Sequence, residues 1–229
     1  MLSENINNIN HKNLRIKFEK TGTAKYISHL DLNRLFSRAI IRAGIKVAHS
    51  EGFNPHPKIV FSSGLALGIE SFCELVDIKI IETIETEVKP VTDGIIFNRL
   101  KDVFPPGINI KEVYTSDNAF KNIDKTRFYI FVKFVKPDGF GIGELDKLFE
   151  GDVFVEKKPG VSINLKDYIY HMNISEEFEY IKIDAVVKTN QDMFLNPENI
   201  IKGINTRFTI EDYFIQKREM YDKNYKIFR

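Results

Sequence analysis

The amino-acid sequence predicts an α+β fold, and three observations carry that prediction. Leu14, Ile16 and Phe18 alternate with charged residues, which is typical of a strand with one buried face. Apolar residues from Leu32 to Ala43 follow the spacing of one helical face. The order strand, helix, strand, strand, helix, strand then extends over about residues 13–114. This order is the split βαβ, or ferredoxin-like, pattern, with both helices on one face of an antiparallel sheet and the other face free for a partner.

Each element of this first half has its own signal. Ser28 is a good N-cap for the first helix, Asp31 stands three residues later, and Gly44 ends the helix. Thr92 can cap the second helix, and prolines at 105 and 106 stop it. The further elements are expected as strands over 45–50, 59–62, 75–81 and 108–113, a loop over 51–58 and a helix over 92–104.

The second half predicts a diverged copy of the same pattern. Its expected elements are strands over 128–135, 153–155 and 180–187, helices over 142–149 and 197–204, and a final strand over 208–215 whose sequence also fits a helix. Residues 158–177 do not fit and are interpreted as an insertion. The expected organisation is a disordered lead-in over 1–12, a ferredoxin-like domain over 13–115, a linker near 116–125 and a second α+β domain over 126–229.

Composition excludes several classes of protein. The chain has 229 residues, 43% of them hydrophobic and 28% charged, which is ordinary for a soluble domain. One cysteine, Cys73, excludes an internal disulfide and a Cys-rich zinc or iron–sulfur site. No stretch approaches the roughly 20 apolar residues of a membrane helix, and the polar N-terminus has no signal core. We therefore expect a cytoplasmic protein with no membrane association and no metal site.

Charge is distributed unevenly although the net charge is only +1. Lysines and arginines dominate from His11 to Lys58, whereas acidic residues dominate from Ile59 to Glu112. A polarised surface of this kind can attract a polyanion such as RNA. An ordinary solvated face would give the same pattern.

The loop at Gly52-Phe53-Asn54-Pro55-His56-Pro57-Lys58 is the most unusual local sequence. Its prolines restrict the backbone of Asn54 and His56. Lys58 could hold a phosphate, and His56 could donate to one or act as an acid or base. A tight structural turn explains the prolines equally well. We take Phe53, Asn54, His56 and Lys58 as candidate binding residues.

The first helix adds a basic stripe. Arg34, Arg38 and Arg42 recur every four residues and could contact a phosphate backbone, although such stripes are more often solvated. Tyr26 and His29 lie at the start of this helix, where free N–H groups favour an anion. The sequence places the proline loop between the second and third strands. We therefore expect it beside the helix N-terminus, in one shared polar cleft.

Three runs in the first half resemble a known family. They are Y-I-S-H-L-D-L-N-R-L-F-S-R-A-I-I-R-A-G-I from Tyr26, G-F-N-P-H-P-K from Gly52 and G-L-A-L-G-I-E-S from Gly64, followed by Glu74 and Asp77. Together they are similar to the radical-SAM-linked protein family, also called DUF2344. The resemblance implies a radical-SAM partner with a cobalamin-binding domain. The iron–sulfur cluster, S-adenosylmethionine and cobalamin would belong to that partner, and this chain would hold no cofactor.

Three functions remain open at this point. The leading hypothesis is an accessory module that binds RNA, or an RNA-containing substrate, and presents it to the radical-SAM partner. A second is a metal-independent RNA-processing enzyme, for which Tyr26, His29, His56 and Lys58 supply the residue types. That second hypothesis rests on analogy at the level of the fold. A third is a protein-interaction scaffold.

Overall fold

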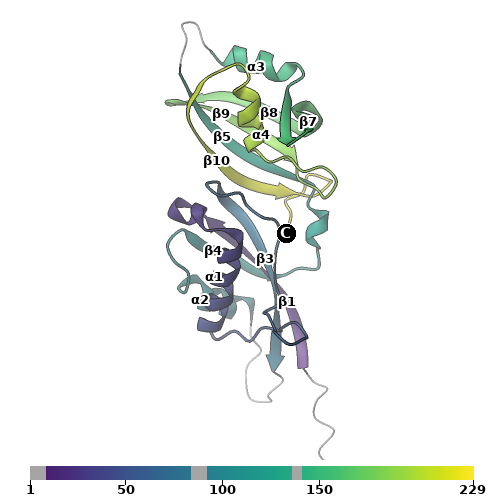
Figure 1. The fold of residues 1–229 in the computed structure, drawn as a ribbon. Coiled ribbons are helices and arrows are strands. Elements are labelled where there is room, and N and C mark those ends of the chain that lie inside the picture. The colour runs from purple at the N-terminus through teal and green to yellow at the C-terminus, as the bar shows by residue number, and fades with distance from the viewer. Residues whose placement is uncertain (1–8, 84–91, 136–140) are drawn as a thin grey trace, which may run out of the picture. The chain divides into compact units, whose positions relative to one another are not determined.

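The computed structural model describes residues 9–83, 92–135 and 141–229, and the chain divides into two compact units, Met1–Ala119 and Phe120–Arg229. Each unit is built from an antiparallel sheet and two helices (Figure 1). The α+β fold and the two ferredoxin-like units are therefore confirmed. The first eight residues of the expected lead-in lie outside the described residues.

The first unit has the strand order of a split βαβ fold. In its sheet β1 lies between β4 and β3, β2 pairs with the other edge of β3, and all pairs are antiparallel. The two βαβ halves thus interlock as the sequence predicts. Its elements are β1 (Ile9–Lys20), α1 (His29–Arg42), β2 (Ile59–Phe61), β3 (Glu70–Thr83), α2 (Asp93–Lys101) and β4 (Ile108–Thr115).

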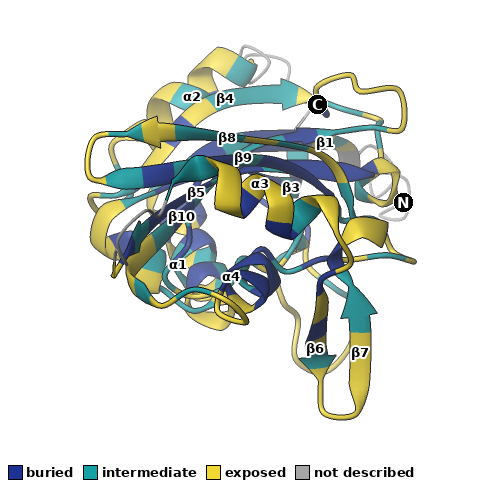
Figure 2. Ribbon diagram, turned by 90° about the horizontal axis from the view of Figure 1, so that it is seen from above, coloured by how far each residue is buried: buried dark blue, intermediate teal, exposed yellow. Residues whose placement is uncertain are grey.

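The core of this unit lies between the sheet and its helices. Leu14, Ile16 and Phe18 of β1 are each at most 1% exposed, as their alternation predicts. Phe36 of α1 packs on Phe18 with ring centroids 4.8 Å apart. Leu35 is only partly buried at the margin of the core. Figure 2 shows the buried residues along the strands and on the inner sides of the helices.

Local signals set the ends of α1. The Ser28 hydroxyl accepts a hydrogen bond from the Asp31 backbone N–H at 3.1 Å and donates one to the Asp31 carboxylate at 2.7 Å. The predicted cap is therefore confirmed. The helix ends at Arg42, and Gly44 has the left-handed φ of +67° that follows many helices.

The second unit repeats the pattern with an added hairpin. Its sheet has the order β10-β5-β9-β8, again fully antiparallel, whereas β6 and β7 pair only with each other. The elements are β5 (Lys125–Phe134), α3 (Ile142–Glu150), β6 (Phe154–Lys158), β7 (Val161–Asn164), β8 (Ile169–Glu177), β9 (Tyr180–Lys188), α4 (Glu198–Ile204) and β10 (Ile210–Tyr221).

The predicted insertion over 158–177 was wrong in its position. The true addition is the β6–β7 hairpin, whereas Ile169–Glu177 forms β8, the edge strand of the sheet. An edge strand buries little of either face, and β8 has no fully buried residue. It therefore lacks the alternation by which its neighbours are recognised.

Several boundaries also differ from prediction. Residues 9–12 belong to β1 and not to a disordered lead-in, because the long β3 supplies pairing partners as far as Thr83. Residues 45–50 form only isolated bridges, and α2 ends at Lys101. Residues 210–221 are a strand, which settles the choice between strand and helix. Within the described residues, no helix has the length and apolar character needed to cross a membrane.

Candidate functional site

The proline loop lies between two short pairings with the same strand, β3. Val47 bridges Ile80 of β3, and Ile59 of β2 pairs with Ile78 on the same edge. The Lys58 backbone N–H donates to the Ala48 carbonyl at 2.8 Å, which closes the gap between these two pairings. The intervening residues 49–57 therefore project from the sheet as an excursion, which we call the β2 excursion.

Hydrogen bonds fix the base of the β2 excursion. His49 bridges Pro57, and the Ser50 N–H donates to the His56 carbonyl at 2.8 Å. The His56 N–H donates in return to the Ser50 hydroxyl at 3.0 Å. Gly52 has a φ of +128°, a conformation that side chains rarely allow. Together with the two prolines, these contacts restrict the backbone of the loop.

The β2 excursion displays its side chains outward. The Phe53 side chain is fully exposed, at 112% of its reference area, and Asn54, His56 and Lys58 are exposed beside it in sequence. Within the described residues, the Lys58 ammonium has no hydrogen-bond or ion-pair partner. The excursion thus offers a ring face, an imidazole and a free cation to solvent.

The topological premise for the expected position of this loop was wrong, because the loop precedes β2 and does not join β2 to β3. The residues that reach the start of α1 come instead from the end of β2 and the β2–β3 connection. The Phe61 ring lies 5.4 Å from the His29 ring, and the Gly68 N–H donates to the Lys25 carbonyl at 3.1 Å. Lys58 lies about 10 Å along the strand from Phe61. A shared cleft between the excursion and the helix N-terminus stays a prediction, but the topology no longer supports it.

Two arginines of the α1 stripe have partners. Arg34 forms an ion pair with Asp31 at 3.2 Å, with both side chains well exposed. The Arg42 guanidinium donates to the Val103 carbonyl at 3.3 Å. Among the described residues Arg38 alone of the three has neither contact, and it is exposed. The Ser28 hydroxyl, with a smaller contribution from Arg34, holds the pKa of Asp31 below its ordinary value.

The candidate catalytic residues are not joined to one another. Tyr26 is 65% exposed with the Lys25 ammonium 5.4 Å from its ring, and the His29 ring packs edge-on against Phe61. Within the described residues, no hydrogen bond links Tyr26, His29 and His56. In the same part of the chain, no three His, Cys, Asp or Glu side chains lie where they could hold a metal ion.

A buried lysine was missed by the sequence reasoning. Lys20 ends β1 at 1% exposure, and its ammonium donates to the Lys25 carbonyl at 3.1 Å. Burial lowers the pKa of Lys20, and the Glu74 carboxylate opposes that effect. The alternation of Leu14, Ile16 and Phe18 could have revealed it. Lys20 is the next residue in this series, so it lies on the same buried face of the strand.

A second missed feature is a cluster of rings and cations on the sheet of the second unit. Tyr129 is half-buried between two buried residues of β5, so it lies on the face away from the helices, and Phe131 lies two residues further on the same face and is buried. The Lys182 ammonium lies 4.2 Å from the Tyr129 ring centroid. The Phe131 ring stacks on Phe214 at 4.5 Å. The alternation over 128–135 predicts the outward positions, but not what gathers around them.

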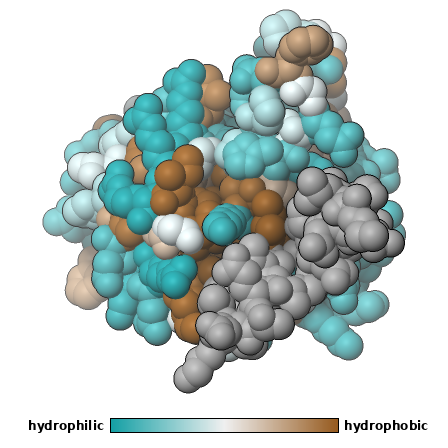
Figure 3. Space-filling view, turned by 90° about the horizontal axis from the view of Figure 1, so that it is seen from below, coloured by the Kyte–Doolittle hydropathy of each residue, from teal (hydrophilic) through white to brown (hydrophobic). Residues whose placement is uncertain are grey.

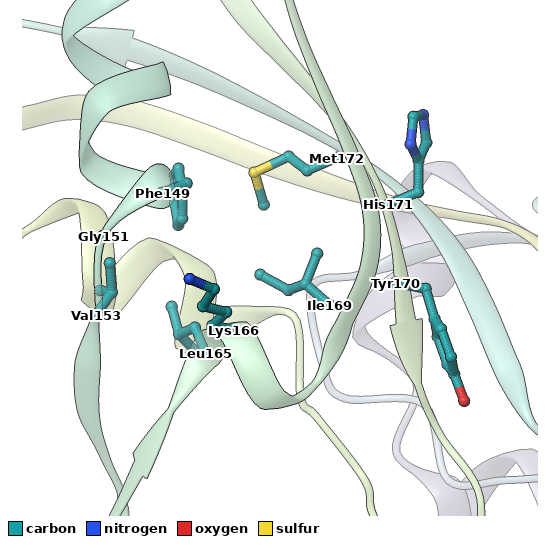
Figure 4. A pocket seen from close by; sticks show the side chains of 9 residues that line it. All are labelled: Phe149, Gly151, Val153, Leu165, Lys166, Ile169, Tyr170, His171 and Met172. Atoms are coloured by element: carbon teal, nitrogen blue, oxygen red, sulfur yellow. The ribbon is translucent and has the colours of Figure 1, made fainter.

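The described pocket of the second unit is too small for a typical ligand. Its volume is about 160 Å³, below the roughly 300 Å³ at which ligand pockets begin. Figure 4 shows Met172 and Ile169 directed toward Phe149, whereas the Tyr170 ring points away. The cavity is a packing gap between α3, β8 and the start of the hairpin.

The described surface also carries exposed apolar side chains. Besides Phe53, the side chains of Phe178 and Ile41 are exposed at 103% and 68%. Figure 3 shows apolar side chains gathered at the centre of one face, with hydrophilic ones around them. Isolated exposed apolar residues are common on protein surfaces, so exposure alone does not indicate a binding site.

Similarity to solved structures is weak. A protein of unknown function from Galdieria sulphuraria has a TM-score of 0.27 and 10% identity, over 91% of this chain and 99% of that one. The small subunit of acetolactate synthase from Thermotoga maritima has a TM-score of 0.27 and 12% identity, over 91% and 94%. A putative glycine cleavage system transcriptional repressor has a TM-score of 0.24 and 9% identity, over 90% and 98%.

Sequence comparison gives a clearer result. No curated protein matches the chain. A family model described as "Uncharacterized protein conserved in bacteria (DUF2344)" matches residues 13–197, which include most of both units. The chain therefore belongs to the DUF2344 family.

Proposed function

We propose that this protein is an accessory module that binds RNA and presents it to a radical-SAM partner. The observation that carries the RNA part is the β2 excursion, a pinned loop with Phe53 fully exposed and a free cation at Lys58. The partner part rests on the resemblance of the motifs from Tyr26, Gly52 and Gly64 to radical-SAM-linked proteins. The cluster, S-adenosylmethionine and cobalamin are assigned to that partner.

The chemistry of the excursion suits an unpaired nucleotide. An exposed phenyl ring can stack on a base, and such a contact contributes about 1–3 kcal/mol per base. An ammonium nearby in sequence can neutralise a phosphate. The hydrogen bonds at Ser50 and His56 support this role, because a loop held in advance loses less entropy on binding.

The described contacts favour a binding module over an enzyme. A metal-independent nuclease needs its acid, base and stabilising cation around one reacting phosphate. Tyr26 and His29 lie at the start of α1, and the His29 ring is occupied by Phe61. His56 belongs to the β2 excursion, and its described hydrogen bonds join its backbone to Ser50.

Binding of labelled single-stranded RNA to the full chain tests the proposal. We expect Lys58→Ala to weaken binding and to lower the slope of log affinity against log salt by about one. Phe53→Ala should weaken binding at every salt concentration without changing that slope. Lys166→Ala, which removes an exposed lysine in the second unit, serves as the matched control.

The outcomes separate the candidate functions. Binding that neither Lys58→Ala nor Phe53→Ala alters would overturn the excursion as the RNA site. Cleavage of the RNA in the presence of EDTA would instead establish the enzyme. The partner is tested separately. A tagged form of the chain should co-purify with a radical-SAM protein, and an excess of untagged chain should compete this protein away.

A further inference from the structure

We infer that the open sheet face of the second unit is a stacking site for an unpaired nucleotide. This inference rests on the proposed function, because it adds a second contact for the same class of ligand. The site consists of Tyr129 and Phe131 on β5, Phe214 on β10 and the cations around them, and we call it the aromatic platform.

Strand register brings the rings of the platform together. Phe131 pairs directly with Phe214 of β10 on one side and with Lys182 of β9 on the other. The Phe131 and Phe214 rings are stacked, with centroids 4.5 Å apart and planes at 11°. The Tyr180 ring meets Phe214 edge-on at 5.3 Å. Phe131 is buried, at 8% exposure, whereas Phe214 and Tyr129 are half-buried and keep part of their surfaces accessible.

Three cations surround Tyr129. The Lys182 ammonium lies 4.2 Å from its ring centroid, and the guanidinium carbons of Arg218 and Arg127 lie at 5.0 Å and 5.4 Å. Their side chains come from three adjacent strands, β9, β10 and β5. Each cation near the ring is attracted to its face, and each can also neutralise a phosphate attached to a stacked base.

Carboxylates balance part of this charge. Asp184 accepts from the Arg127 guanidinium at 2.8 Å, and Glu177 forms an ion pair with Lys182 at 3.1 Å. Arg218 contacts the Gln216 amide oxygen at 3.5 Å. The platform is therefore only moderately basic, and its affinity should come more from stacking than from phosphate contacts. This mixture of rings and cations suits unpaired nucleotides, whose bases stack on sheet aromatics.

The equivalent face of the first unit differs. There Arg15 of β1 lies at 1% exposure, held by Asp77 of β3 and by the Asn118 carbonyl at 2.7 Å. On its other side Arg15 pairs with Tyr114 of β4. Burial of the arginine therefore distinguishes this face from the platform, where the Arg127 side chain is 38% exposed.

The test measures binding of fluorescent 12-nucleotide RNA to the full chain, with DNA of the same sequence and a duplex as further probes. We expect Tyr129→Leu and Phe214→Leu each to weaken binding about tenfold, the loss expected for one stacked base. Tyr213→Leu is the matched control, since Tyr213 lies next to Phe214 but bonds Glu198 on the helix side at 2.9 Å. Single strands should bind better than the duplex, and the RNA and DNA arms show which one the protein takes.

The outcomes distinguish this inference from the proposed function. Loss of binding in Tyr129→Leu but not in Phe53→Ala or Lys58→Ala supports the platform and overturns the excursion. Loss only in the excursion variants keeps the proposed function and overturns the platform. Equal binding of duplex and single strand also overturns the platform, because paired bases cannot stack on its rings.

Discussion

At the scale of single residues, the start of α1 shows how few atoms define a helix end. One hydroxyl, that of Ser28, both accepts from the Asp31 backbone and donates to its carboxylate. Arg34 adds an exposed ion pair to the same carboxylate. Arg34 is also the first residue of the stripe proposed from sequence as a basic surface, so part of that charge is already engaged.

Replacing the cap tests its contribution. Ser28→Ala should lower the free energy of unfolding by about 1 kcal/mol, because the Asp31 N–H loses its acceptor. Denaturant unfolding followed by circular dichroism measures the change. Ser28→Asp, which keeps an acceptor at the cap, should lose less; an equal loss in both variants would contradict a capping role.

The Asp31 carboxylate gives a pH-dependent version of the same contact. Its pKa in the folded state lies below the ordinary value of 3.8, first because of the Ser28 hydroxyl and then because of Arg34. A lowered pKa contributes stability above the ordinary value, and that contribution is lost as pH falls through the folded pKa. NMR titration should therefore place Asp31 below 3.8 and move it upward in Ser28→Ala. An unchanged midpoint would contradict the assignment.

At the scale of elements, the two units repeat one ion pair with different burial. Arg15 of β1 bonds Asp77 of β3, and Arg127 of β5 bonds Asp184 of β9, so each pair joins a first strand to a third. The Arg15 side chain is 1% exposed, whereas that of Arg127 is 38% exposed. Burial therefore makes the first pair far more sensitive to the loss of its carboxylate.

The two pairs provide a matched comparison. Asp77→Ala should lower the free energy of unfolding by about 3 kcal/mol, because the buried Arg15 guanidinium loses the carboxylate that accepts its hydrogen bonds. Asp184→Ala should cost about 1 kcal/mol, since water can reach Arg127. Unfolding free energies of both variants test this order. A larger loss in Asp184→Ala would show that exposure does not decide the cost.

At the scale of the whole molecule, the chain is two units with separate cores. The core cluster around Phe18 and Phe36 draws all its members from the first unit. The second unit buries its own set on β5, β9 and α4, including Ile130, Ile183 and Ile200. Damage to one core should therefore stay within its unit.

Gly107→Ala tests that separation. Gly107 has a φ of +90°, and an added Cβ would clash with the Thr21 carbonyl oxygen, so we expect the free energy of unfolding to fall by about 3 kcal/mol. Hydrogen exchange should show reduced protection in β1 and β3, with β5 and β9 unchanged. Gly160→Ala, at φ +76° with open space around it, should cost only about 1 kcal/mol. Equal loss of protection in both units would show that they unfold together.

Local sequence patterns were enough to predict the helices and the strands that bury one face. Ser28 and Thr92 mark helix starts, and Leu14, Ile16 and Phe18 mark a strand, because capping and alternation act between residues close in the chain. Local patterns also sufficed to predict the repeated split βαβ fold.

Only the tertiary structure decided which segments pair and what gathers on their faces. It showed that β8 is an edge strand and that the proline loop precedes β2, between two pairings with β3. It also brought Lys182 and Phe214 beside Phe131. These contacts join residues tens of positions apart, and strand register sets them. Register depends on the packing of the whole sheet, which no local pattern records.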